Sequence, residues 1–101
     1  MALEITGTIE LGNGLSVPSC YSRTTFQLKE NGTQVMIFVD TWNSQTDYAN
    51  GKYPFADNVF RLESMYSYDR TTDGTDLLSF SNQVIKTQLE AQGYSVVITE
   101  L

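Results

Sequence analysis

The first segment of the chain alternates between apolar and polar residues. Over positions 3–11, leucine or isoleucine fills every odd position except Gly7, and glutamate or threonine fills the even ones. A repeat of two residues places the apolar side chains on one face, as in a strand that is buried on one side. The glycines and asparagine at 12–14 predict a turn that ends this strand.

A second pattern predicts a β-hairpin. Two runs rich in β-branched and aromatic residues, at about 21–30 and 33–42, flank the dipeptide Asn31-Gly32. Asn-Gly is the preferred central pair of a two-residue type I′ turn, because both positions of that turn need a positive φ. The sequence therefore predicts two antiparallel strands joined by this turn.

Such a turn fixes the register of the two strands. On one face it places Thr24, Phe26 and Leu28 opposite Val39, Ile37 and Val35, in that order. The other face pairs Gln27 with Met36, Thr25 with Phe38, Arg23 with Asp40 and Tyr21 with Trp42. The turn thus produces an opposite-charge pair and an aromatic pair, which both favour the hairpin. Because this second face is only partly polar, we expect a second layer or another subunit to cover it.

Beyond residue 57 the pattern first predicts a strand and then a helix. Residues 58–70 return to strand character, with four large apolar side chains on one side: Phe60, Leu62, Tyr66 and Tyr68. A turn at 71–75 leads into a helix at about 76–92, whose apolar residues fall mostly on one stripe. Thr75 is the expected N-cap of this helix, and Gly93 stands where a C′ glycine commonly ends one.

The last segment, 94–101, is rich in valine, isoleucine and tyrosine and predicts a terminal strand. The order is therefore strand, hairpin, long loop, strand, helix, strand, without an internal repeat or a linker. A chain of 101 residues has the size of one domain, so we expect residues 1–101 to form a single unit. The expected fold class is α+β, a mainly antiparallel sheet or small β-sandwich with one helix from the C-terminal half packed on it.

Residues 43–57 have the least pattern. A loop of ~15 residues is unusual in so small a domain, and such loops are often functional or mobile. Tyr48, Tyr53 and Phe55 lie in it, and with Trp42 they form the candidate interface, because aromatic residues supply large, rigid contact area. Trp42 fits the core as well as an interface, whereas Tyr53 and Phe55 in the loop favour an interface.

Charge and hydropathy exclude several classes of function. The chain has 12 acidic and 6 basic residues, a formal net charge of −6. Because the basic residues are dispersed rather than clustered, we expect no binding to nucleic acid. The first residues lack the basic and apolar regions of a signal peptide, and no apolar run is long enough to cross a bilayer. We therefore expect neither a signal peptide nor a contact with a membrane.

The residues that usually carry catalysis are scarce. Histidine is absent, which removes Ser-His-Asp and Cys-His catalysis and imidazole-bound metals. Cys20 is the only cysteine, so no intrachain disulfide can form, and we expect it to be a small buried residue. Asp69, Asp73 and Asp76 suggest a calcium loop, but Phe80 occupies the position of the required glutamate, so a turn before a helix explains them better. We expect no enzyme activity, no cofactor and no metal site.

The opening strand, Glu4-Ile5-Thr6-Gly7-Thr8-Ile9-Glu10-Leu11, followed by Asn13-Gly14, resembles that of small structural proteins of tailed-phage virions. The Asn31-Gly32 hairpin, the aromatic middle loop and the single late helix before a terminal strand are also similar. The resemblance implies a non-enzymatic protein present in many copies in a tail, neck, baseplate or capsid. It implies no specific binding residues.

The function expected from the sequence is therefore that of a non-catalytic assembly subunit of a virion, made in the host cytoplasm. It would contact neighbouring copies or other virion proteins through strand edges and the 43–57 loop. We expect a homo-oligomer or a part of a larger assembly. The alternative is a small carbohydrate- or peptide-binding module that uses Trp42 and the loop tyrosines as a platform.

Overall fold

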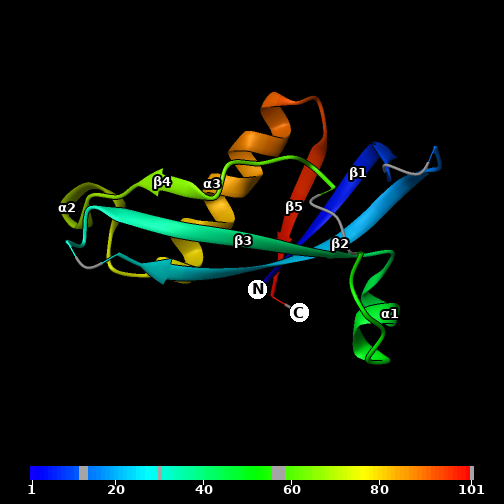
Figure 1. Cartoon of the computed structure of the whole chain (residues 1–101), viewed down its shortest axis with the longest axis horizontal. Coiled ribbons are helices and arrows are strands. Elements are labelled where there is room, and N and C mark those ends of the chain that lie inside the picture. The colour runs from blue at the N-terminus through cyan, green and yellow to red at the C-terminus, as the bar shows by residue number, and fades with distance from the viewer. Residues whose placement is uncertain (12–13, 30, 56–58, 101) are drawn as a thin grey trace.

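The chain folds around a five-stranded antiparallel sheet with the order β4-β3-β2-β1-β5 (Figure 1). The computed structural model describes residues 1–11, 14–29, 31–55 and 59–100. Positions 12–13, 30, 56–58 and 101, on which parts of the predicted turn, hairpin, loop and strands fall, lie outside the described residues. The strands are β1 (Ala2–Glu10), β2 (Ser16–Leu28), β3 (Gln34–Trp42), β4 (Met65–Ser67) and β5 (Ser95–Thr99).

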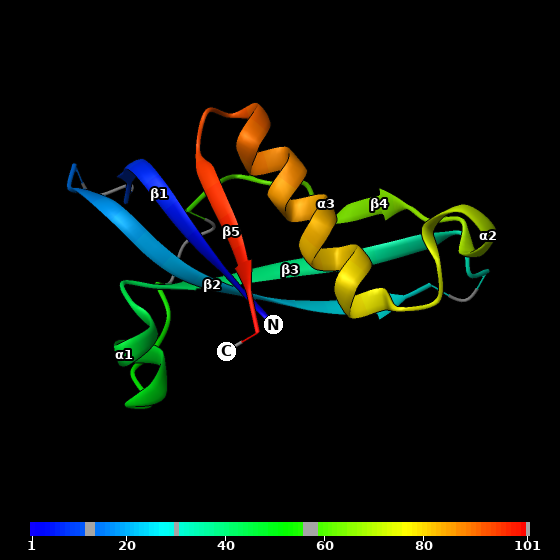
Figure 2. The ribbon, with the colours of Figure 1, turned by 180° about the vertical axis from the view of Figure 1, so that it is seen from behind.

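Three helices accompany the sheet in the described part of the chain. The longest, α3 (Leu77–Ala91), packs against one face of the sheet, and Figure 2 shows it from behind. The short helices α1 (Gln45–Ala49) and α2 (Arg70–Asp73) bury none of their own residues. The predicted α+β class, with a helix from the C-terminal half packed on an antiparallel sheet, is confirmed.

The hairpin of β2 and β3 has the predicted register. Leu28 lies opposite Val35, and the pairing continues without a shift to Tyr21 opposite Trp42. A continuous register over eight residue pairs fixes which side chains share a face of the sheet. The faces that the sequence predicts for the hairpin are therefore confirmed.

The turn of this hairpin differs from the predicted type I′. Asn31 does not have the positive φ that a type I′ turn requires, whereas Gly32 has φ of 67°. The Asn31 Oδ1 accepts a hydrogen bond from the Thr33 N–H at 3.0 Å, and the Gly32 N–H donates to the Lys29 carbonyl at 2.9 Å. The asparagine side chain bonds to the backbone two residues on, which stabilises a different turn with the same register.

The side of the sheet that packs against α3, here called the covered face, forms the core. The strands contribute to it Leu3, Ile5, Cys20, Val35, Ile37 and Val96, all buried. The apolar residues that α3 buries against them are Ile85 and Leu89. The core also holds a buried polar pair, since the Thr24 hydroxyl donates to the Asn82 carboxamide oxygen at 3.1 Å. This bond joins β2 to α3 and offsets the cost of burying both groups.

A β-bulge in β1 lets an aromatic ring pack across the sheet. The register of β1 against β2 shifts between Thr6 and Ile9, and Gly7 has φ of 148°. The ring of Tyr94, just before β5, lies over Gly7, where a Cβ would be only 2.9 Å from the Tyr94 Cδ1. The same ring meets Phe60 edge-on, with centroids 5.3 Å apart. Glycine at this position therefore allows both the bulge and the close approach of the ring.

The segment before α2 is less regular than predicted. Among the described residues 59–70 only Met65–Ser67 forms a strand, and Arg61 has a positive φ of 52°. The four side chains predicted to share one side still join the core or pack against it: Phe60, Leu62, Tyr66 and Tyr68. The apolar pattern thus predicted their burial correctly and their backbone structure wrongly.

The ends of α3 follow ordinary capping rules. Asp76, rather than the predicted Thr75, is the N-cap, and its carboxylate accepts the Ser79 N–H at 3.1 Å. At the other end Gly93 has φ of 98° and donates to the carbonyl three residues back, as predicted for a C′ glycine. The terminal strand begins two residues later and is shorter than the predicted 94–101.

Candidate functional site

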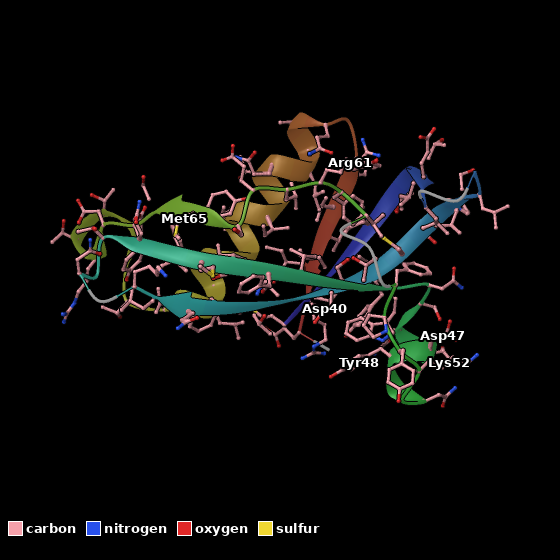
Figure 3. All side chains as sticks on the ribbon, in the orientation of Figure 1. Asp40, Asp47, Tyr48, Lys52, Arg61 and Met65 are labelled. Atoms are coloured by element: carbon pink, nitrogen blue, oxygen red, sulfur yellow. The ribbon has the colours of Figure 1, made fainter. Side chains whose placement is uncertain are left out.

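The face of the sheet opposite α3, here called the open face, carries the candidate residues. The hairpin register places on it Tyr21, Arg23, Met36, Phe38, Asp40 and Trp42. Helix α1 covers one end of this face, next to the end of β3 (Figure 1). Figure 3 shows this end by its labelled side chains Asp40, Asp47, Tyr48 and Lys52.

Three aromatic rings, here called the aromatic cluster, pack together where α1 meets the open face. Tyr48 of α1 meets Trp42 of β3 edge-on, with centroids 4.8 Å apart, and lies 5.5 Å from Tyr21 of β2. Tyr21 and Trp42 are 6.4 Å apart. Tilted and edge-on rings at these distances attract each other. Two predicted interface residues, Trp42 and Tyr48, therefore lie together, and the hairpin register adds Tyr21 to them.

Arg23 of β2 packs against the aromatic cluster. Its Nη1 donates a hydrogen bond of 2.9 Å to the Tyr21 hydroxyl, and its guanidinium carbon lies 4.6 Å from the centroid of the Tyr48 ring. A cation over an aromatic face at this distance is attracted by the ring. Arg23 also lies opposite Asp40 in the strand register, as predicted. Arg23 therefore links α1 to the sheet.

Helix α1 forms in the loop that the sequence left without a pattern. Ser44 is its N-cap, and the serine hydroxyl accepts the Asp47 N–H at 3.2 Å. The Trp42 indole N–H donates to the Lys52 carbonyl at 2.8 Å, and the Lys52 ammonium lies 3.7 Å from the Asp47 carboxylate. Because this ion pair is exposed, it contributes little. The Tyr48 ring and the hydrogen bond of the Trp42 indole therefore hold α1 and the residues after it against the sheet.

The other two predicted interface residues lie apart from the aromatic cluster. Tyr53 is 96% exposed, so its ring has almost no contact with its own chain. Phe55 is half-buried, and its backbone N–H donates to the Thr41 carbonyl at 2.8 Å. The four predicted residues thus have three different environments, and Tyr53 alone is presented fully to solvent.

A second apolar group lies on the open face, where no helix or strand of the described residues covers it. It consists of Met36, Phe38 and Met65 and is here called the β3–β4 patch. Met36 lies opposite Met65 of β4, and Phe38 follows two residues along the same face of β3, with 48% of its surface exposed. Figure 3 labels Met65 on β4. The sequence did not predict Met65 here, because the three residues of β4 have too little pattern to reveal its pairing.

Cys20 is buried on the covered face, as expected. Burial raises the pKa of its thiol from 9.0 to about 12, against the smaller opposing effect of a hydrogen bond with Ser22. A thiol is nucleophilic only as the thiolate, so Cys20 is inert at neutral pH.

The acidic residues that resemble a calcium loop cap helices instead. Asp69 is the N-cap of α2, which replaces the predicted turn at 71–75, and hydrogen bonds from Thr71 hold the pKa of Asp69 below its usual value. The Asp73 carboxylate accepts the Asp69 N–H at 2.8 Å, and Asp76 caps α3. Among the described residues, no three cysteine or acidic side chains gather as metal ligands.

No helix in the described part of the chain has the length and apolar character needed to span a membrane. No family model matches the chain, and no curated protein or solved structure does. The geometry of the open face is therefore the basis for the functional conclusion.

Proposed function

We propose that the protein is a non-catalytic structural subunit that binds copies of itself or other proteins of a virion. The observation that carries this proposal is the β3–β4 patch on a face that α3 does not cover. An antiparallel sheet with one solvated face normally carries polar side chains there. A group of apolar side chains on such a face is typical of a surface that binds another macromolecule.

The use of the reactive side chains supports a role without catalysis. The Cys20 thiol is buried and its pKa is raised, so it is not an available nucleophile. Asp69 and Asp76 bond to backbone N–H groups at helix starts. A general acid or base needs a free carboxyl group near substrate, and these carboxylates serve as caps.

The resemblance to small proteins of tailed-phage virions supports the virion as the setting. In such a particle each subunit is surrounded by others at high local concentration. Contacts that are weak in dilute solution are then sufficient for assembly, because many copies bind together. The β3–β4 patch and the exposed Tyr53 are the side chains best placed for such contacts.

The alternative, a carbohydrate- or peptide-binding module, has less support from the aromatic cluster. Its rings pack against one another at angles of 39° to 75°, and the Trp42 indole N–H is bonded to a backbone carbonyl. A sugar-binding platform needs an aromatic face free for its ligand. Titration with glycans while Trp42 fluorescence is followed separates the two functions, and saturable quenching would favour the binding module.

Co-expression with the genes that flank its own, followed by sedimentation of particles, tests the proposal. We expect the wild-type chain in the particle fraction and a Phe38→Asp variant mainly in the soluble fraction. A Gln83→Asp variant, on the exposed surface of α3, is the matched control and should behave as wild type. A wild-type chain that stays soluble while particles form would contradict the proposal.

A further inference from the structure

The strand β5 is an edge of the sheet that lacks the usual protection against pairing. It neighbours β1 only, beside which it runs in Figure 2. Its residues, Ser-Val-Val-Ile-Thr, include no charge and no proline, and its register with β1 has no bulge. Natural edge strands usually carry one of these features to prevent pairing with another chain. The opposite edge, β4, is only three residues long and so offers little to pair with.

The hydrogen-bond pattern identifies the unpaired backbone groups of β5. The Lys29 N–H donates to the Gln34 carbonyl at 3.0 Å, so the odd-numbered residues of β2 bond to β3. Because the backbone groups of successive residues in an antiparallel strand point to alternate sides, the even-numbered residues of β2 bond to β1. In the registers of β1 with β2 and with β5, the odd-numbered residues of β5 then bond to β1. Val96 and Ile98 therefore direct their N–H and C=O groups outward, where no described residue bonds to them.

The side chains of β5 suit a strand laid alongside it on both faces. Val97, the central residue, is on the open face and is 60% exposed, and Ser95 and Thr99 share that face. On the covered face Val96 belongs to the core and Ile98 packs against it. A neighbouring strand of the same composition would extend the core on one face and cover Val97 on the other.

We propose that two copies of the chain pair antiparallel along β5, with the two-fold axis at Val97. Val96 of one copy then lies opposite Ile98 of the other, and the outward backbone groups of both residues find partners. Val97 lies opposite the same residue of the second copy, and Ser95 lies opposite Thr99. This pairing is self-complementary, as a two-fold dimer requires, and it joins the two sheets into one.

The charges near β5 permit this pairing although each copy has a net charge of −6. Glu4 is next to Val97 in the register of β1, so three strand spacings, about 14 Å, separate the two copies of Glu4. This distance exceeds the Debye length of about 8 Å at physiological salt. Glu100 would lie opposite Tyr94 of the second copy, so no two acidic residues oppose each other.

The inference rests on the proposed function, because it names a second copy as one partner of the subunit. It does not involve the β3–β4 patch, so the two proposals can fail separately. An interface of one short strand is small, and we expect a dissociation constant between about 10 µM and about 1 mM.

Sedimentation equilibrium of the full chain up to about 1 mM measures the dimer directly. A Val97→Lys variant places two ammonium groups opposite each other and should raise the dissociation constant at least about tenfold. The matched Val97→Thr variant keeps a strand-forming residue without charge and should change it less than about threefold. Because Val97 is exposed, circular dichroism should show both variants folded. A wild-type chain that is monomeric at the highest concentration overturns the inference, even if it enters particles.

Disulfide formation locates the dimer contact. In a Cys20→Ser background, a Val97→Cys variant should crosslink rapidly, since opposed residues of a non-bonded pair have Cα atoms about 4.5 Å apart, within the disulfide range. A Gln83→Cys variant, on the exposed surface of α3 and outside both β5 and the β3–β4 patch, is the control. Equal or faster crosslinking of the Gln83→Cys variant would overturn pairing along β5. A dimer that crosslinks at position 97 but never enters particles would instead contradict the proposed function.

Discussion

The covered and open faces of the sheet differ less in their residues than in what lies over them. On β3, Val35 and Ile37 point to the covered face and are buried, whereas Met36 and Phe38 point to the open face and are not. A strand that is apolar on both sides is typical of a sheet with two covering layers. Here α3 supplies one layer, and α1 covers only one end of the other face.

Charged residues also lie on the open face, over which the described residues form no layer comparable to α3. Arg23, Asp40 and Glu4 all stand on it, and Arg23 and Asp40 lie opposite each other. Burying these charges under an apolar helix would cost several kcal/mol each in lost hydration. The covered face has the neutral pair Thr24 and Asn82 instead, which satisfy each other. A partner on the open face is therefore expected to bind at its apolar parts and leave the charges hydrated.

Thiol chemistry should show the largest difference between the two faces. Because burial raises the pKa of Cys20 to about 12, its thiolate at about pH 8 is about a thousandfold scarcer than that of an ordinary thiol of pKa 9.0. Alkylation of native Cys20 should be slower by about that factor than alkylation of a Phe38→Cys variant in a Cys20→Ser background. Similar rates at the two positions would contradict the burial of Cys20.

The same raised pKa predicts how stability depends on pH. The protonated thiol is favoured in the folded chain, so its contribution is fully present below pH 9 and is lost as the pH rises towards 12. The free energy of unfolding should fall more steeply over this range for wild type than for a Cys20→Ala variant. If the free energy of unfolding changes equally with pH in the two proteins, the thiol has the same pKa in the folded and unfolded chain.

Truncation of leucine should show the next largest difference. Leu89 of α3 is fully buried against the covered face, so Leu89→Ala should lower the free energy of unfolding by about 2–5 kcal/mol. Leu28, at the end of β2 that extends beyond β1, is 44% exposed, and Leu28→Ala should cost less than about 1 kcal/mol. Urea denaturation measures both values. Equal losses would mean that the end of β2 is packed as tightly as the core.

The hairpin and α3 could be predicted because their signals are local. The register of β2 and β3 follows from the short stretch of chain between them. The Asn31-Gly32 dipeptide marks the turn, although the predicted turn type was wrong. The turn type depends on a competition between the asparagine backbone and its side chain, which bonds to Thr33. The N-cap of α3 was displaced by one residue because Thr75 and Asp76 are both good caps.

The candidate site was predicted only in part, because its contacts are not local. Register alone paired Tyr21 with Trp42, but it could not show that Tyr48 folds back over them. Helix α1 is five residues long, and helices this short have no periodicity to detect. Met65 lies on the open face because the three-residue strand β4 pairs with β3. Long-range packing positions this strand, and the sequence pattern does not reveal it.

Removal of the Tyr48 ring should have a smaller and local effect. Tyr48→Ala loses the contacts with Trp42, Tyr21 and Arg23, worth about 1–2 kcal/mol together. Because α1 buries none of its residues, the loss should appear in the attachment of α1 rather than in the stability of the sheet. Hydrogen exchange of 45–49 should speed up and Trp42 emission should shift to the red. Tyr48→Phe keeps the ring and should change neither.

The smallest effect on stability is expected at Tyr53. Its ring is 96% exposed, so Tyr53→Ala should change the free energy of unfolding by less than about 0.5 kcal/mol. The half-buried Phe55 should cost about 1 kcal/mol when it is replaced by alanine. Recovery of the chain in the particle fraction tests a role of Tyr53 in assembly. Tyr53→Ala should lower this recovery, whereas Asn50→Ala, at an exposed position nearby, should not. If neither variant changes recovery, Tyr53 is an ordinary exposed residue without a part in assembly.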